Sequence, residues 1–274
     1  MQLYQTLRNR MLGRAVHNPD APLPPEAALN MRLNDARASG WFRTERQELV
    51  EGFRISPDDI VVDVGCGDGS NSAFCGQCGA EVIATDIDPE KVALANHRLA
   101  ASGTSKFKAM VSDSNPLPIA DATATRVIAM EVLEHVESPE RFMSELVRVG
   151  KPGSLYFIMV PDVLGETVNK SIAPESYWRS PHHLRIFQHQ EFDDLIQNAG
   201  LKIESHVRHT FYWSMWWFLF WACEQEFGEP EVPLLDNWTR TWERLISTPK
   251  GLRVKEALDK AMPKSYGVVA RKVA

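Results

Sequence analysis

Residues 61–70 read VVDVGCGDGS, and this stretch decides the fold. Three glycines, at positions 65, 67 and 69, follow a short β-branched run and precede a predicted helix. Glycine allows sharp backbone turns and lets a ligand approach the main chain closely. The dinucleotide-binding pattern G-x-G-x-x-G would need glycine or alanine at position 70, where this chain has serine. Because Asp63 lies two residues before the first glycine, the loop is better suited to a positively charged ligand than to a pyrophosphate.

Strands and helices alternate along the chain after this loop. Short apolar runs rich in β-branched residues predict strands, and the segments between them have helical spacing. The predicted strands are 60–65, 81–86, 107–113, 125–132 and 154–160, and the predicted helices are 70–79, 89–103 and 138–153. This alternation indicates an α/β fold with a mostly parallel sheet.

The remaining segments are less regular. Helical spacing recurs before the loop, over 1–16 and 26–54, and the prolines of 18–25 separate these two segments. After the fifth strand, a polar and aromatic connector is predicted over 161–186, followed by a helix–glycine–strand unit over 189–209. A mostly helical segment is predicted over 210–263 and a final strand over 265–273.

Acidic residues stand at the ends of the second and third predicted strands. Asp86 ends the second strand, and Asp113 ends the third. In parallel sheets, ligands bind at the carboxyl ends of the strands, and a carboxylate at the tip of the second strand can accept both hydroxyls of a ribose. Asp113 could accept the amino group of an adenine. Together with the glycine loop, these acids predict a nucleoside site.

These segments resemble the class I S-adenosylmethionine-dependent methyltransferases, in the small-molecule, type 11-like group. The resemblance rests on VVDVGCGDGS (61–70), ATDID (84–88), the whole of residues 110–160 and HLRIFQHQEFDDLIQNAGLKI (183–203). It implies a Rossmann-like seven-stranded sheet, mostly parallel with an antiparallel last strand, and helical cap insertions. The motifs are specific for the cofactor and say little about the substrate.

The same resemblance implies how the chain is divided. Residues 55–209 and 264–274 would form the cofactor-binding core, and residues 1–54 an N-terminal helical extension of the cap. Because the sixth strand of this fold is parallel and the last is antiparallel, the connection between them leaves from the ligand edge. Residues 161–186 and 210–263 would therefore cover the active site as cap insertions.

Site residues follow from the resemblance by position. Asp63, Gly65, Cys66 and Gly67 would frame the methionine part of S-adenosylmethionine, whose product is S-adenosylhomocysteine. The ribose and adenine would meet Asp86, Ile87, Asp113 and Ser114. Glu131, after the fourth strand, would lie near the sulfonium.

A histidine is the expected base, because its pKa lies near neutrality. His183 is the favoured candidate, followed by His182 and His135. Two structural alternatives stay open: His135 could serve the cofactor site or the fold, and His182 or His183 could cap the next helix. No metal site is predicted, because the CxxC of Cys75 and Cys78 lacks a second ligand pair and is expected to pack a helix.

Composition bounds the partners and the compartment. The 274 residues carry a net charge of −6, which gives no basic field for nucleic acid. Four cysteines in a chain of this length do not indicate a disulfide scaffold. The N-terminal region has no continuous apolar run, so no secretory signal is predicted. A reducing cytoplasm is therefore expected. The expected partner is a small-molecule acceptor, and a homodimer stays open.

Residues 211–221, FYWSMWWFLFW, raise the question of a membrane. The apolar run, 211–223, would make a helix roughly 20 Å long against a hydrocarbon core of about 30 Å, so it is too short to span. Its position between the last two strands places it in the cap. Four readings stay open: cap core, pocket wall, contact with a membrane surface and dimer interface. The pocket reading assigns acceptor binding to Tyr177, Trp178, Trp213 and Trp217.

Two functions are consistent with these observations. The first is methyl transfer from S-adenosylmethionine to a small, apolar or amphipathic acceptor, with oxygen as the expected target atom. The alternative is a protein that binds S-adenosylmethionine without transferring its methyl group and whose aromatic cap binds a lipid or a protein.

Overall fold

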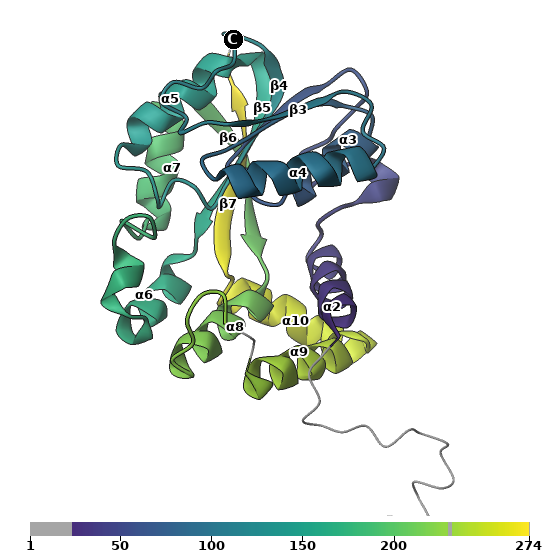
Figure 1. Cartoon of the computed structure of the whole chain (residues 1–274), viewed down its shortest axis with the longest axis vertical. Coiled ribbons are helices and arrows are strands. Elements are labelled where there is room, and N and C mark those ends of the chain that lie inside the picture. The colour runs from purple at the N-terminus through teal and green to yellow at the C-terminus, as the bar shows by residue number, and fades with distance from the viewer. Residues whose placement is uncertain (1–23, 230–231, 274) are drawn as a thin grey trace, which may run out of the picture.

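A computed structural model describes residues 24–229 and 232–273, and its centre is one seven-stranded sheet (Figure 1). The strands lie in the order β3-β2-β1-β4-β5-β7-β6, and β7 runs antiparallel to both of its neighbours. Their bounds are β1 Ile60–Val64, β2 Glu81–Asp86, β3 Phe107–Val111, β4 Ala124–Met130, β5 Gly150–Pro161, β6 Leu201–His209 and β7 Ser265–Lys272. The predicted fold class is confirmed, including the antiparallel last strand.

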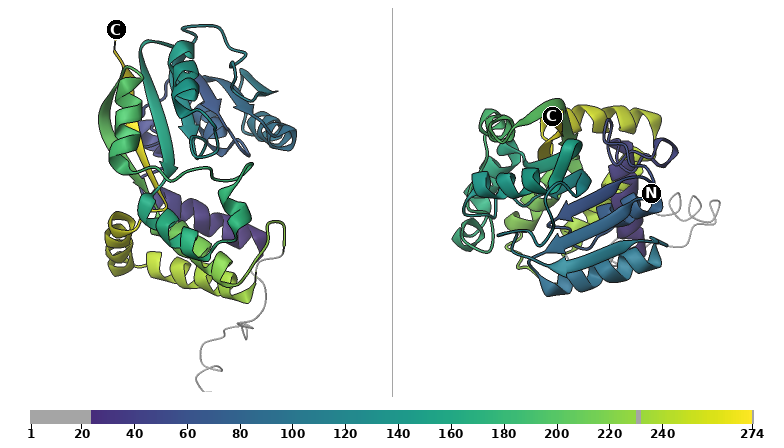
Figure 2. Two further views of the ribbon diagram at one scale, coloured as in Figure 1. Left: turned by 90° about the vertical axis from the view of Figure 1, so that its left-hand side faces the viewer. Right: turned by 90° about the horizontal axis from the view of Figure 1, so that it is seen from above.

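Helices cover both faces of the sheet (Figures 1 and 2). One face packs against α3 (Ser70–Gln77) and α4 (Pro89–Ala101), and the other against α5 (Pro139–Val149) and α7 (His189–Asn198). The central strands are apolar along nearly their whole length because both of their faces are covered in this way. The polar ligand site is therefore confined to the edge of the sheet.

Helices also gather at the carboxyl edge of the parallel strands, where they form a cap (Figure 1). This cap consists of α2 (Pro25–Ala38), α6 (Val163–Ile172), the 3-10 turn η2 (Glu175–Trp178), α8 (Phe211–Ala222), α9 (Pro233–Ile246) and α10 (Pro249–Ala261). The helical prediction for 210–263 matches α8 to α10, whereas α6 forms inside the segment predicted as an irregular connector.

The predicted helix over 26–54 is wrong beyond residue 38. Helix α2 ends at Ala38, and Gly40 then takes a left-handed φ of 89° that a continuing helix does not allow. The following apolar residues Trp41, Leu49 and Phe53 are buried against the sheet from an irregular loop. Their spacing reflects this burial rather than a helical face. The predicted helix over 1–16 lies outside the described residues.

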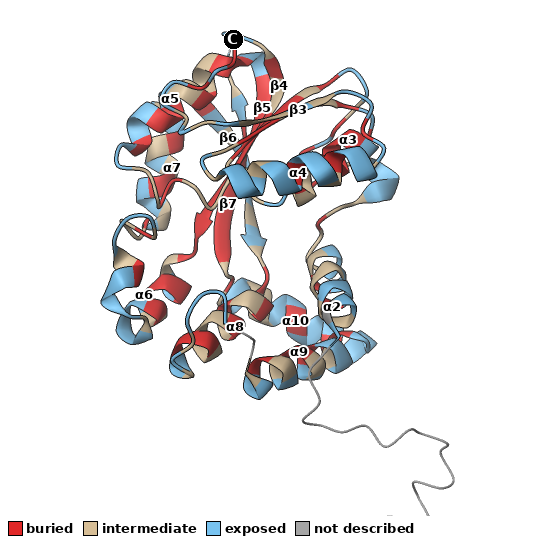
Figure 3. Ribbon diagram, in the orientation of Figure 1, coloured by how far each residue is buried: buried red, intermediate tan, exposed pale blue. Residues whose placement is uncertain are grey.

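The tryptophan-rich helix α8 packs mainly into the cap. Its buried side chains include Trp216, Phe220 and Trp221, and they contact a cluster formed with Met31 of α2 and Trp242 of α9. Trp213 and Trp217 are half-buried and pack against the same cluster, so the partly open positions of α8 alternate with buried ones (Figure 3). Within residues 24–229 and 232–273, no helix is both long and apolar enough to cross a bilayer.

A buried polar network joins the parts of the cap. Lys255 of α10 forms ion pairs of 2.8 Å with Asp35 of α2 and with Asp259. Asp35 also accepts hydrogen bonds from Thr210, the residue that caps α8, and from the indole of Trp242. These contacts tie α2, α8, α9 and α10 to one another around one lysine and two aspartates.

Candidate active site

The glycine loop leaves open space beside its backbone. A Cβ added to Gly65 would collide with Val132 Cγ2, so this glycine is required for packing against the segment after β4. A Cβ added to Gly67, by contrast, would meet no atom within 4 Å, and its φ of 54° favours glycine. Gly67 therefore offers a bare stretch of main chain that a ligand can approach.

Asp86 closes the glycine loop onto β2. Its Oδ2 accepts the backbone N–H of Gly67 at 2.9 Å, and its Oδ1 accepts that of Asp88 at 3.0 Å. Each carboxylate oxygen keeps a further lone pair for a ligand donor. The next residue, Ile87, is 71% exposed, which leaves an apolar side chain at the strand tip for a flat ring to cover. This arrangement fits a ribose with an attached base.

Asp63 is the buried acid of the loop. Its carboxylate accepts a hydrogen bond of 2.6 Å from Ser72 Oγ. Burial raises its pKa to about 6, the hydrogen bond from Ser72 opposes this shift, and the nearby Asp86 adds to it. A positively charged ligand group would stabilise the ionised form.

The remaining predicted cofactor residues surround this centre. Asp113 lies two residues beyond β3, is exposed, and accepts the backbone N–H of Asn115 at 3.0 Å. Ser114 beside it has a left-handed φ of 61°. Burial raises the pKa of the Cys66 thiol, which keeps it protonated and unsuited to act as a nucleophile.

Glu131 is paired with a residue that sequence reasoning missed. Lys264, just before β7, donates from Nζ to Glu131 Oε2 at 2.6 Å. Glu131 has a left-handed φ of 55°, and its other oxygen, Oε1, is buried with no hydrogen-bond partner among the described residues. A lone lysine before a strand carries no sequence signal for this role, because 133 residues separate it from Glu131.

His183 lies in a second polar group, beside the aromatic residues of the connector. Its Nδ1 is 2.6 Å from Glu166 Oε2, and its Nε2 is 3.2 Å from the hydroxyl of Tyr177. Burial would raise the pKa of Glu166, but the hydrogen bond from His183 and the charge of Lys264 lower it overall. Glu166, a residue that sequence reasoning missed, thus stays ionised and orients the ring of His183. The helix-cap alternative is wrong for both His182 and His183, because Gln188 caps α7.

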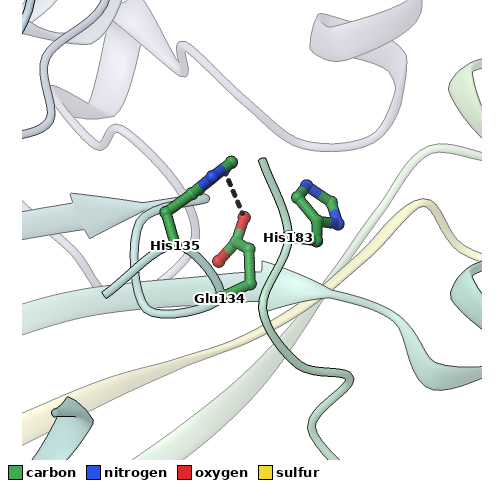
Figure 4. Close-up of side chains that lie close together, drawn as sticks. All are labelled: Glu134, His135 and His183. Carbon is green, nitrogen blue, oxygen red and sulfur yellow. Dashed lines mark ion pairs between the residues drawn. The ribbon is translucent and has the colours of Figure 1, made fainter. Parts of the chain in front are cut away.

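His135 and Glu134 face His183 from the segment after β4 (Figure 4). Glu134 is 1% exposed, and neither of its carboxylate oxygens has a hydrogen-bond partner in the described chain. Burial and the neighbouring Glu131 raise its pKa well above the ordinary range. Burial and then His183 lower the pKa of His135, whose Nδ1 lies 3.0 Å from the carbonyl oxygen of Pro181.

Among residues 24–229 and 232–273, these three side chains form a group that could hold a cation. One ligand atom from each of Glu134, His135 and His183 lies within 4.8 Å of the others. Since Glu166 and Tyr177 already contact the two nitrogens of His183, a cation bound to this ring would have to displace one of these two contacts. The thiols of Cys75 and Cys78 are free and buried, as expected for residues that pack a helix.

The predicted aromatic residues divide between two places. Tyr177 and Trp178 lie beside His183, with ring centroids 4.6 and 6.1 Å from it. Trp217 stacks on Trp221, whose ring is in turn 4.8 Å from Tyr177. In contrast, Trp213 lies under the guanidinium of Arg32 at 4.9 Å.

His182 also contacts the aromatic group, with its ring centroid 5.9 Å from that of Tyr177, whereas a cavity on the edge of the sheet lies apart from it. His182 stacks on Phe227 at 5.3 Å, and none of the described carboxylates bonds to it. A cavity of about 550 Å³ opens beside Ser39, Arg208 and Lys260, and its lining includes no residue predicted to bind cofactor or acceptor.

Comparison with known proteins agrees with this geometry. Residues 62–158 match a family model described as a methyltransferase domain. A ubiquinone biosynthesis O-methyltransferase from Rhizobium johnstonii is 34% identical over 180 residues, which cover 61% of this chain and 72% of that protein. A probable S-adenosylmethionine-dependent methyltransferase from Mycolicibacterium smegmatis is 26% identical over 193 residues, 68% of this chain and 70% of the relative.

Solved structures show the same fold. A geranyl diphosphate methyltransferase in complex with S-adenosylmethionine aligns with a TM-score of 0.57 at 15% identity, over 93% of this chain and 94% of that one. The open backbone at Gly67, the lone pairs of Asp86 and the exposed Ile87 fit the cofactor's nucleoside, and the buried acids suit its positive charge. The chain belongs to the class I S-adenosylmethionine-dependent methyltransferases.

Proposed function

We propose that the enzyme transfers the methyl group of S-adenosylmethionine to a hydroxyl of a small, apolar or amphipathic acceptor. The observation that carries this proposal is the line of contacts from Glu166 through His183 to Tyr177. A carboxylate that accepts from one ring nitrogen of a histidine fixes the tautomer and leaves the other nitrogen as a base. A hydroxyl is a weak nucleophile and benefits from such a base.

Each residue then has a defined part in the reaction. S-adenosylmethionine, when bound, would supply the methyl group, and its sulfonium would be the leaving group. His183 Nε2 takes the proton of the acceptor hydroxyl as its oxygen bonds to the methyl carbon, and Glu166 stabilises the imidazolium. Tyr177 now occupies the position next to Nε2, so the acceptor hydroxyl either replaces its contact or passes the proton through it.

Aromatic side chains around His183 support an apolar acceptor. Tyr177, Trp178 and Trp221 form a continuous series of ring contacts from the histidine to α8. Such rings bury apolar groups and stack on planar ones. The relatives include enzymes named for O-methylation in ubiquinone biosynthesis and of tocopherol, and these names support oxygen as the target atom.

A direct assay tests the proposal. We expect formation of S-adenosylhomocysteine with a 4-alkylcatechol or alkylphenol, and little with an alkylamine of equal chain length. His183→Gln should reduce kcat by about 100-fold or more, in line with loss of a general base, while S-adenosylmethionine affinity stays within about twofold. His206→Gln is the matched control, because this exposed histidine on β6 pairs with Asp193 and contacts none of the residues around His183.

Other outcomes would reject the proposal in distinct ways. Methylation of the amine alone would assign nitrogen as the target atom. Cofactor binding without turnover of any of these probes would favour a protein that binds S-adenosylmethionine without transferring its methyl group. Equal losses in both histidine variants would show that His183 has no special role.

We place this reaction in the cytoplasm. All four cysteines are free thiols, and Cys75 and Cys78 are buried, which suits a reducing compartment. We also propose a homodimer through the half-buried tryptophans of α8, and sedimentation equilibrium should then show twice the mass of the chain.

A further inference from the structure

Phe227 lies in the turn that follows α8, and its side chain is 53% exposed. Its ring nevertheless contacts rings from two separate segments of the cap, with centroid distances from 5.3 to 6.4 Å. These rings belong to Tyr177 and His182 of the connector and to Trp217, Phe220 and Trp221 of α8. The ring of Phe227 therefore bridges the connector and α8, while part of it stays open to solvent.

The turn that carries Phe227 is held by hydrogen bonds of its own. Glu229 Oε2 accepts from the backbone N–H of Glu226 and from the side chain of Gln225, each at 3.2 Å. In the part of the chain that the structure describes, no hydrogen bond joins residues 224–229 to the connector. The turn thus reaches the connector through the ring of Phe227, which is the contact that an apolar ligand could extend.

A series of ring contacts leads from Phe227 to the proposed base. The ring centroids of Phe227 and Tyr177 are 6.4 Å apart, and those of Tyr177 and His183 are 4.6 Å apart. The Tyr177 hydroxyl lies 3.2 Å from His183 Nε2, the atom to which the acceptor hydroxyl would bind. An acceptor whose hydroxyl reaches this nitrogen could therefore lay an apolar tail across Tyr177 and onto the open part of Phe227.

The turn itself is acidic. Residues 224–229 read EQEFGE, which includes glutamates and neither lysine nor arginine. Two cations of the neighbouring connector segment already have partners, because Arg179 pairs with Glu175 at 2.7 Å and Lys170 lies 5.9 Å from the ring centroid of Trp178. A carboxylate at the end of the tail would be repelled by the turn, whereas an uncharged tail would be stabilised by burial of its apolar surface.

We propose that Phe227, with His182 stacked on it, binds an uncharged apolar tail of the acceptor and makes the enzyme select acceptors by chain length. The gain from burial grows with apolar area, so each methylene that covers the ring adds affinity. Because this contact is remote from the reacting oxygen, it stabilises the bound acceptor and the transition state equally, which lowers KM and leaves kcat unchanged. The inference rests on the acceptor site of the proposed function.

Equilibrium binding in the presence of S-adenosylhomocysteine tests the inference without turnover. The probes are 4-methylcatechol, 4-heptylcatechol and the heptyl probe with a carboxylate at the end of its tail. The unmodified protein should bind the heptyl probe at least about 10-fold more tightly than either of the other two. In Phe227→Ala, affinity for the heptyl probe should fall about 10-fold, because the tail loses the ring that it covers, whereas affinity for 4-methylcatechol should stay within about twofold.

Three further variants guard the interpretation. Phe227→Leu keeps an apolar side chain and should retain most of the affinity for the heptyl probe. Leu94→Ala removes an exposed apolar side chain from α4, outside the cap, and should bind all three probes normally. The double variant Glu224→Gln/Glu226→Gln, measured at low salt where charge repulsion is least screened, should bind the carboxylate probe more tightly than the unmodified protein does.

The results separate this inference from the methyl-transfer proposal. Equal affinity for the methyl and heptyl probes, no binding of the heptyl probe, or an unchanged affinity of Phe227→Ala for it would overturn the inference. Equal losses for both probes would overturn it too, since Phe227 would then support the head group, and equal affinity for the heptyl and carboxylate probes would overturn the requirement for an uncharged tail. Chain-length-dependent binding that Phe227→Ala abolishes, without methylation of either catechol, would support the inference and reject the methyl-transfer proposal.

Discussion

Asp63 shows how the burial of a single carboxyl group makes stability depend on pH. Its carboxyl is buried, receives one hydrogen bond from Ser72, and lies near Asp86. Because its pKa in the folded protein is about 6, above the ordinary value of about 3.9, the folded state binds this proton more tightly than the unfolded state. The stability that this proton contributes is present below about pH 4 and is lost as the pH rises through 6.

Asp63→Asn should therefore stabilise the cofactor-free protein near neutral pH. The expected gain in unfolding free energy approaches roughly 3 kcal/mol at pH 7 and vanishes near pH 4, since a shift of one pKa unit corresponds to about 1.4 kcal/mol. Urea unfolding at several pH values measures it. Asp113→Asn, at an exposed acid after the next strand, is the control. A gain that is the same at every pH would contradict the assigned cause.

At the scale of the secondary-structure element, the tryptophans of α8 differ in burial and in what they contact. Trp216 and Trp221 are buried in the cap, whereas Trp217 is half-buried and stacks on Trp221, which contacts Tyr177. Cap core and pocket wall are therefore not exclusive alternatives for one helix. Nearly all side chains of α8 are apolar, so its sequence alone could not show which of them are buried. Their burial depends on partners from α2 and α9.

Trp216→Ala and Trp217→Ala should separate the two roles. Loss of the buried Trp216 should lower the free energy of unfolding by about 3 to 5 kcal/mol, because it leaves a cavity. Trp217→Ala should cost less stability and raise KM for an alkylphenol acceptor. Thermal unfolding and steady-state kinetics on both variants measure these effects. A normal KM in Trp217→Ala would remove this residue from the acceptor pocket.

At the scale of the whole molecule, the cap depends on contacts between distant parts of the chain. Asp35 and Lys255 form a buried ion pair that joins α2 to α10 and reaches Thr210 and Trp242. Removing one partner of such a pair leaves a buried charge without compensation. The arrangement of helices over the active site should therefore depend on both residues.

Lys255→Met should destabilise the protein by about 3 to 5 kcal/mol, and the double variant Asp35→Asn/Lys255→Met should recover part of this loss. Lys260→Met, at an exposed pair, should change stability by less than about 0.5 kcal/mol. Denaturant unfolding gives the free energies, and limited proteolysis shows whether the cap opens first. No recovery in the double variant would mean that Asp35 is not the decisive partner.

Local patterns in the sequence predict much of this molecule and miss the rest for physical reasons. The β-branched runs predict β1 and β2 closely, because strands buried on both faces leave a clear apolar signal. His183 could be chosen as a candidate base, but its partner Glu166 could not, since α6 reads as part of a polar connector. The pairing of Lys264 with Glu131 depends on strand order in space, which no short stretch of sequence contains.

The position of β7 between β5 and β6 has a consequence for the newly made chain. During synthesis, β6 emerges before β7, yet it has no neighbour in the sheet until β7 arrives and pairs with both β5 and β6. The half of the sheet from β3 to β5 can assemble earlier, because its strands pair among themselves. Lys264 and the helices before it reach their places at the same late moment. A ribosome-bound chain that stops before β7 would thus present the glycine loop but lack the Lys264–Glu131 pair. Its β5 strand would be an unpaired edge of the sheet, which is a site that chaperones protect from aggregation.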